Sequence, residues 1–184
     1  MIRLFIALVI PEEVISVVLS ERDKILGDEK NIRWEPKEKL HITLKFLGDT
    51  KKSLVEQICT ELETVVKRTE PLKLDLNKFG VFKREREPKI LWVGMKESKP
   101  LSNFVDEIEE SFCKFGYTKE GREFKPHITL LRFRGSEDTN KILKLLEVSL
   151  PSLSFYAKKV SLIKSELKKT GSVYSELKSF LIEK

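Results

Sequence analysis

The spacing of apolar residues along the chain switches between the two-residue period of a strand and the 3.6-residue period of a helix. Strands are predicted at residues 2–10, 32–34, 40–46, 72–82, 90–95, 126–133, 155–167 and 171–182. Helices are predicted at residues 11–26, 54–70, 100–115 and 137–146, with Ser53 and Ser136 as caps of the second and fourth. The order of elements before and after mid-chain is similar, which suggests two pseudo-repeated lobes.

The strands at 40–46 and 126–133 contain the same tetrapeptide, His-Ile-Thr-Leu, and its two copies hold both histidines of the chain. Side chains on a strand alternate between its faces, so His41 and Thr43 share one face, as do His127 and Thr129. Each strand therefore combines an apolar face for the core with an imidazole and a hydroxyl about 6–7 Å apart. The repeated motif indicates a shared chemical role, and two half-buried structural histidines are the alternative.

Length and charge limit the class of protein. The 184 residues suffice for one compact unit or two small lobes with a shared core, and 40% of them are hydrophobic. The formal charge of +6 fits a nucleic-acid partner. The 35% of charged residues and the single glutamine, Gln57, equally fit the surface of a thermophile protein. Both interpretations stay open, because a thermophile protein can also bind RNA.

The sequence contains no pattern typical of a disulfide framework, a membrane span or a metal site. Cys59 and Cys113 are isolated, which favours a reducing cytoplasm over a disulfide framework. The apolar run at residues 4–10 is too short to span a bilayer, so no membrane association is expected. The histidine faces offer no carboxylate or thiolate to complete a metal site, so neither a metal nor a cofactor is expected.

Two His-x-Thr motifs about half a chain apart resemble the two-histidine phosphoesterase superfamily. The chain is most similar to its RNA 2′,3′-cyclic phosphodiesterase branch, whose members are also called 2′-5′ RNA ligases. Further matching stretches are residues 3–8 with Pro11, residues 33–34, residues 40–48, residues 126–132, Ser165 and residues 171–174. One His-x-Thr motif is weak evidence, whereas two with these flanking residues are specific.

The resemblance implies one two-lobed domain over residues 1–184 with an α+β, bilobal and pseudo-symmetric fold. Two antiparallel sheets are expected to face a central cleft, with helices on the outside and one motif per lobe, at residues 41–44 and 127–130. The implied activity is metal-independent hydrolysis of a terminal RNA 2′,3′-cyclic phosphate to a 2′-phosphomonoester. The alternatives are a 2′-5′ RNA ligase running the reverse reaction and a non-catalytic RNA-end-binding module. The expected protein is a cytoplasmic monomer whose partner is an RNA end, such as that of a tRNA fragment.

The resemblance also assigns roles to residues. It makes His41 the proton donor to the leaving ribose oxygen and His127 the proton acceptor from water. Thr43, Thr129 and Arg132 are expected to bind the phosphate. Arg132 lies five residues after His127, a spacing that places it on the opposite face of a regular strand. It reaches the cleft only if the strand bends or bulges, and an outward, solvated arginine is the alternative.

Four further side chains are candidates for substrate contact. Lys45 shares the predicted histidine face and either lines the cleft or is solvated. Phe5, Trp34 and Tyr174 are candidates to stack on a base, because RNA recognition often uses aromatic rings in this way. Ordinary core packing is the alternative for Phe5 and Trp34.

Overall fold

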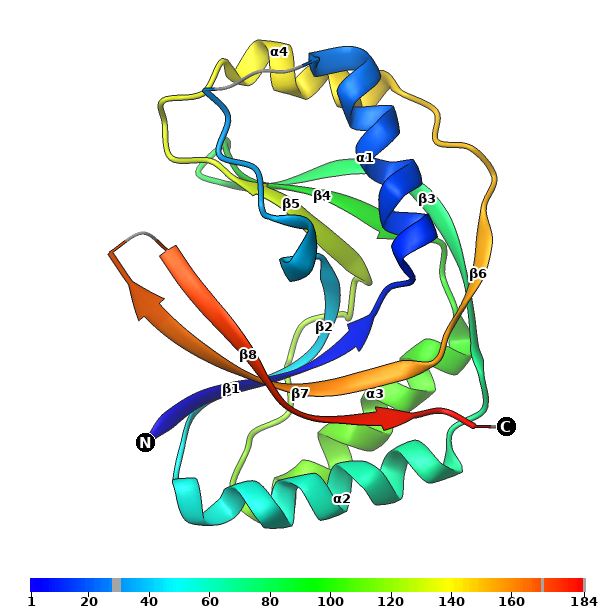
Figure 1. Cartoon of the computed structure of the whole chain (residues 1–184), viewed down its shortest axis with the longest axis vertical. Coiled ribbons are helices and arrows are strands. Elements are labelled where there is room, and N and C mark those ends of the chain that lie inside the picture. Colours follow the sequence, from blue (N-terminus) through cyan, green and yellow to red (C-terminus); the bar gives the residue numbers. More distant parts are fainter. Residues whose placement is uncertain (28–30, 170, 184) are drawn as a thin grey trace.

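The computed structural model describes residues 1–27, 31–169 and 171–183, and Figure 1 shows a strongly curled antiparallel sheet with helices on its outer side. The strands are β1 (Ile2–Val9), β2 (His41–Thr50), β3 (Leu72–Arg84), β4 (Glu87–Met95), β5 (His127–Arg132), β6 (Ser154–Ala157), β7 (Lys159–Lys168) and β8 (Gly171–Leu181). The α-helices are α1 (Glu12–Leu26), α2 (Val55–Arg68), α3 (Lys99–Phe112) and α4 (Thr139–Leu143). Short 3-10 turns are η1 (Lys37–Lys39), η2 (Lys52–Leu54), η3 (Cys113–Phe115) and η4 (Lys144–Glu147). The predicted α+β class is confirmed.

The sheet has the strand order β6-β3-β4-β5-β2-β1-β7-β8 and divides into two four-stranded halves. The halves meet between β2 and β5, where Ile42 opposite Ile128 is the only pair in register in the described part of the chain. The two sheets implied by the resemblance are therefore halves of one curled sheet. These halves do not follow the order of the sequence, because the C-terminal hairpin β7–β8 completes the half that β1 and β2 begin.

Two pairs of helices cover the two halves of the sheet (Figure 1). The helices α2 and α3 pack on each other, with α2 against β8 and α3 against β2. At the other end, α1 and β3 both contact η4, the turn that follows α4. The apolar face of each motif strand lies under this cover, and Ile42 and Ile128 are both at most 1% exposed. The opposite faces of β2 and β5 are thereby left to the concave side of the sheet.

Both motif strands carry a β-bulge at the leucine of His-Ile-Thr-Leu. In β2 the pairing with β1 skips Leu44, and in β5 the pairing with β4 skips Leu130. An extra residue reverses the alternation of the side chains that follow it. Consequently the Arg132 side chain lies on the same face as His127, as expected for a strand that bulges between them. The prediction that Lys45 shares this face is wrong, because the bulge turns Lys45 to the helix side, where it is 5% exposed.

Four predicted elements differ from the structure. Residues 32–34 form no strand and are instead a turn in which the Trp34 N–H donates to the Ile32 carbonyl. The turn η2 places Ser53 inside a 3-10 turn, so α2 begins at Val55 without the predicted side-chain cap. The cap of α4 is Asp138 and not Ser136, and the helix is one short turn. The predicted strand at 155–167 is two strands, because the chain changes partner from β3 to β1 at Lys158.

Residue 170, between the predicted strands at 155–167 and 171–182, lies outside the described residues. No helix in the described segments is long and apolar enough to cross a membrane.

Candidate active site

The two His-x-Thr pairs lie on the same concave face, on adjacent strands. Because Ile42 pairs with Ile128 in antiparallel register, His41 lies across from Thr129 and His127 across from Thr43. This diagonal places the two histidine backbones about 7–8 Å apart, near enough for both imidazoles to contact one phosphoryl group. Both motifs line one pocket, and the arrangement has an approximate local two-fold symmetry about the Ile42–Ile128 pair.

Backbone hydrogen bonds support both imidazole rings. The Nδ1 of His127 lies 2.7 Å from the carbonyl oxygen of Lys125, two residues earlier. A carbonyl only accepts hydrogen bonds, so Nδ1 carries the proton in the neutral ring and Nε2 is free to exchange one. A backbone hydrogen bond with Lys39 also supports the His41 ring, whose Nε2 lies 3.2 Å from Thr43 Oγ1 within the same motif.

The electrostatic setting makes both histidines harder to protonate. The pKa of His41 is lowered to about 4, chiefly by burial; the backbone hydrogen bond to Lys39 opposes this shift, and the charges of Arg132 and His127 add to it. Burial likewise lowers the pKa of His127, with Arg132 adding to the effect. Both rings are therefore neutral near pH 7 in the free protein.

Arg132 brings the positive charge of its guanidinium to the pocket. The bulge at Leu130 turns its side chain to the histidine face, where it lines the pocket and stays half exposed. The carboxylate of Glu35 lies 3.5 Å from Arg132 Nε and also lines the pocket. Glu35 is held there by its own N–H, which donates to the carbonyl of Leu130 over 2.8 Å. The bulge thus positions the arginine and also anchors its partner.

Aromatic rings surround His41. Phe5 stacks on its imidazole with ring centroids 5.0 Å apart, and Tyr174 meets it edge-on at 5.8 Å. Phe46, five residues after His41, takes the position that Arg132 takes after His127, and its side chain lines the pocket at 70% exposure. Lys39 lies over the Tyr174 ring and also lines the pocket. This side of the pocket offers flat apolar surface and one cation.

A second aromatic group lies beside His127. Phe82 meets its imidazole edge-on, with ring centroids 4.8 Å apart. Trp92 lies behind, 6.2 Å from the imidazole and 5.1 Å from the Phe82 ring. Since Trp92 is paired with Thr129 across β4 and β5, it belongs to the same concave face.

Seven of the nine predicted site residues come together at the pocket; these are Phe5, His41, Thr43, His127, Thr129, Arg132 and Tyr174. Lys45 is not among them, since its ammonium pairs with Glu109 of α3 behind the sheet. Trp34 does not line the pocket either; it packs against the core with the Arg22 guanidinium 4.6 Å above its ring.

Sequence reasoning missed three pocket residues, Glu35, Lys39 and Phe46. One signal could have found Phe46. It occupies the same place in its motif as Arg132, so a bulge that turns one inward turns the other inward too. Glu35 and Lys39 flank the motif in a loop and a short turn, where no periodicity indicates a direction.

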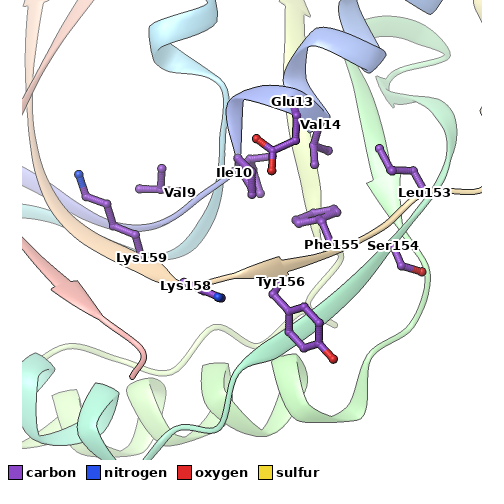
Figure 2. A pocket seen from close by; sticks show the side chains of 11 residues that line it. Val9, Ile10, Glu13, Val14, Leu153, Ser154, Phe155, Tyr156, Lys158 and Lys159 are labelled. Carbon is purple, nitrogen blue, oxygen red and sulfur yellow. The ribbon is translucent and has the colours of Figure 1, made fainter. Parts of the chain in front are cut away.

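No group of three or more metal-binding side chains gathers anywhere in residues 1–27, 31–169 and 171–183. A larger groove of about 460 Å³ lies where β1 leads into α1, beside β6 and the start of β7 (Figure 2). It is lined mostly by apolar side chains such as Ile10, Val14 and Phe155, and it shares no residue with the histidine pocket. The histidine pocket is therefore the candidate site for acid–base chemistry.

Known proteins resemble this chain over nearly its whole length. It is 26% identical over 183 residues to an RNA 2′,3′-cyclic phosphodiesterase of Methanothermobacter thermautotrophicus, covering 97% of this chain and 98% of that protein. It is 29% identical over 180 residues to an RNA 2′,3′-cyclic phosphodiesterase of Methanocaldococcus jannaschii, covering 97% and 99%.

Solved structures share its fold. TT0787 of Thermus thermophilus superposes with a TM-score of 0.81 at 23% identity, covering 98% of this chain and 97% of that one. Escherichia coli LigT complexed with 3′-AMP gives a TM-score of 0.77 at 25% identity, covering 100% and 99%. The model of the 2′-5′ RNA ligase superfamily matches residues 23–169. This chain therefore belongs to the 2′-5′ RNA ligase superfamily.

Proposed function

We propose that this protein is an RNA 2′,3′-cyclic phosphodiesterase, which opens a terminal cyclic phosphate to a 2′-phosphomonoester with two histidines and no metal. The observation that carries the proposal is the convergence of both His-x-Thr pairs and Arg132 on one pocket. The near full-length similarity to proteins named RNA 2′,3′-cyclic phosphodiesterase supports the same substrate.

The proposed reaction is an in-line displacement at phosphorus. Water attacks from the His127 side, and His127 Nε2 accepts its proton as the new P–O bond forms. The bond from phosphorus to the 3′-oxygen breaks on the opposite side, and His41 donates a proton to that oxygen. The Thr43 and Thr129 hydroxyls and the Arg132 guanidinium bind the non-bridging oxygens, where negative charge grows in the transition state.

The protonation states agree with these roles once substrate is bound. A neutral His127 is ready to accept a proton from water. His41 has to gain a proton before it can donate one, and its low pKa opposes this in the empty pocket. The negative charge of a bound phosphodiester raises the pKa of a neighbouring imidazole. Substrate binding and protonation of His41 are therefore coupled in this mechanism.

The orientation of the substrate follows from the surroundings of the two histidines. Phe46 and Tyr174 offer apolar ring surface beside His41, which suits the base and ribose of the terminal nucleotide, whereas Phe5 is 3% exposed and packs against both rings. This orientation puts the leaving 3′-oxygen near His41 and supports its role as the donor. Trp34 and Lys45 have no assigned part in this reaction.

The proposed natural substrate is a tRNA-like fragment with a cyclic phosphate end, bound by a monomer in a reducing cytoplasm. The formal charge of +6 favours an RNA partner. Every proposed catalytic residue comes from one chain, so catalysis needs no second copy. Cys59 and Cys113 are both unpaired, which suits a reducing compartment.

The test is direct. The protein is incubated with an oligoribonucleotide that ends in a 2′,3′-cyclic phosphate, and the end groups of the products are resolved. The expected product is the 2′-phosphomonoester alone, and both His41→Ala and His127→Ala should lose about 10² to 10⁴ of the rate. A 3′-phosphate product would mean that the bond from phosphorus to the 2′-oxygen breaks instead. Binding without turnover would instead favour the non-catalytic RNA-end-binding module.

A further inference from the structure

Lys39 is a pocket residue that the hydrolysis described above does not use. Three side chains with a fixed charge line the pocket, those of Glu35, Lys39 and Arg132. Glu35 and Arg132 form an ion pair over 3.5 Å, and the proposed reaction assigns Arg132 to the cyclic phosphate. Among the described residues no carboxylate forms an ion pair with Lys39. The pocket therefore holds one cation that a further anion could neutralise.

Two contacts hold the Lys39 ammonium at the pocket. It donates to the Ser172 carbonyl oxygen over 2.5 Å, and its Nζ lies 5.5 Å from the centroid of the Tyr174 ring. These contacts join η1 to the start of β8. An ammonium has three N–H donors, so two remain for a ligand. Because fixing a lysine side chain costs conformational entropy, a lysine that is already held in place loses less of it on binding an anion.

Lys37, at the start of the same turn, makes a different set of contacts. Its ammonium pairs with the Glu12 carboxylate over 2.6 Å, its side chain is 54% exposed, and it does not line the pocket. A 3-10 turn has three residues per turn, so side chains two positions apart point in different directions. Lys39 is thus the half-buried lysine of η1 that faces the pocket.

The stereochemistry of a ribonucleotide shows where a second anion lies. The 5′-carbon and the two oxygens of a 2′,3′-cyclic phosphate are on opposite faces of the ribose ring. In an RNA chain the 5′-oxygen carries the phosphodiester to the preceding nucleotide, so the terminal nucleoside lies between two anions. When Arg132 and the two motifs bind the cyclic phosphate, the second anion lies beyond the nucleoside. Lys39 is on that side, since it contacts Tyr174, one of the rings proposed to hold the nucleoside.

We propose that Lys39 binds the phosphodiester on the 5′ side of the terminal nucleotide, so that the pocket selects the end of an RNA chain over a 2′,3′-cyclic mononucleotide. The inference rests on the proposed function, because it takes the orientation in which the nucleoside lies beside His41. The bond between the ammonium and a non-bridging oxygen is charge-assisted. Lys39 takes no part in the bonds that break and form, so it determines specificity and is not a catalytic residue.

The test compares two dinucleotides that end in a 2′,3′-cyclic phosphate and differ in one group. Adenylyl-adenosine 2′,3′-cyclic phosphate has the natural phosphodiester between its nucleosides, and its analogue has an uncharged methylphosphonate there. The wild type should hydrolyse the charged dinucleotide with a kcat/KM about tenfold higher, the size of one hydrogen bond to a charged group. In Lys39→Met the two kcat/KM values should become equal. Any damage to His41 affects both substrates, so it cancels in their ratio.

Matched variants separate the phosphodiester contact from a structural role. Lys37→Met removes the same charge from the same turn but outside the pocket, and it should keep the wild-type ratio. Lys39→Arg keeps the positive charge and should retain most of the ratio. An equal fall of both kcat/KM values in Lys39→Met, with the ratio unchanged, would overturn the proposal, since Lys39 would then only join η1 to β8. A wild type that does not distinguish the dinucleotides, or an equal loss of the ratio in Lys37→Met, would overturn it too.

Equilibrium binding keeps the role of Lys39 testable without turnover. His41→Ala lacks the proposed proton donor, so the intact dinucleotides can be titrated into it in a calorimeter. It should bind the charged dinucleotide about tenfold more tightly than the methylphosphonate, and His41→Ala/Lys39→Met should bind both equally. Equal binding of the two dinucleotides by His41→Ala contradicts the role of Lys39. Discrimination in binding together with no hydrolysis by the wild type contradicts the proposed function instead.

Discussion

Replacing Lys45 with methionine should destabilise the fold without weakening substrate binding. The Lys45 ammonium pairs with the Glu109 carboxylate and donates to the Thr118 carbonyl over 3.1 Å. The two side chains are 3% and 11% exposed. Once the lysine is removed, the remaining polar contact of the Glu109 carboxylate is the Glu120 N–H at 3.2 Å. Leaving one buried charge without its partner lowers the free energy of unfolding strongly, whereas removing both charges together often does not.

The magnitude follows from this burial. Breaking a buried ion pair typically costs about 3–5 kcal/mol, and the slight exposure of Glu109 places Lys45→Met near the lower end. A loss of about 3 kcal/mol should lower the melting temperature of a chain of this size by roughly 6–12 °C. The double variant Lys45→Met/Glu109→Leu should recover most of the loss, because no unpaired charge is left behind.

The assay is urea unfolding of the wild type, both single variants and the double variant, with KM for a 2′,3′-cyclic phosphate measured below the unfolding transition. Lys67→Met is the matched control, since its pair with Glu63 is solvent-exposed and should change stability by less than about 1 kcal/mol. An unchanged stability together with a raised KM in Lys45→Met would refute the bulge at Leu44, because Lys45 would then lie in the cleft.

Three further predictions test the chemistry and the partner. Hydrolysis should survive excess EDTA, because no group of three or more metal-binding side chains gathers in the described part of the chain; full loss of activity with recovery on Zn²⁺ or Mn²⁺ would contradict the two-histidine mechanism. The logarithm of RNA affinity should fall with the logarithm of salt concentration at a slope of roughly −0.7 per contacted phosphate. An affinity that does not change with salt would mean that the positive charge of the surface makes no phosphate contacts. Because burial lowers the pKa of His41 to about 4, the folded state resists its protonation, and as pH falls from 6.5 to 4 the protein should lose up to about 3 kcal/mol of stability through this residue. In His41→Gln the urea midpoint should fall less than in the wild type between pH 6.5 and 4. Identical plots of urea midpoint against pH for the two proteins would contradict the lowered pKa of His41.

Much of the site was predictable because strand alternation is a local property. The sequence alone places each histidine on the same face as its threonine, opposite the apolar residues that need a core. Glycine and proline likewise mark several element boundaries, as at Pro11 and Gly27, which flank the two ends of α1. These inferences depend only on neighbouring residues, so the tertiary structure does not change them.

Tertiary structure decided what depends on pairing between distant strands. Alternation fails wherever a bulge adds a residue, and the bulges at Leu44 and Leu130 exist only in the register with β1 and β4. They send Lys45 to α3 and bring Arg132 to the pocket, although both residues lie close to a histidine in sequence. The split at Lys158 has the same origin, since a continuous apolar alternation cannot reveal a change of partner. Likewise, only the folding of β3 and β4 beside β5 brings Phe82 and Trp92 to His127, because such contacts depend on long-range register and not on local sequence.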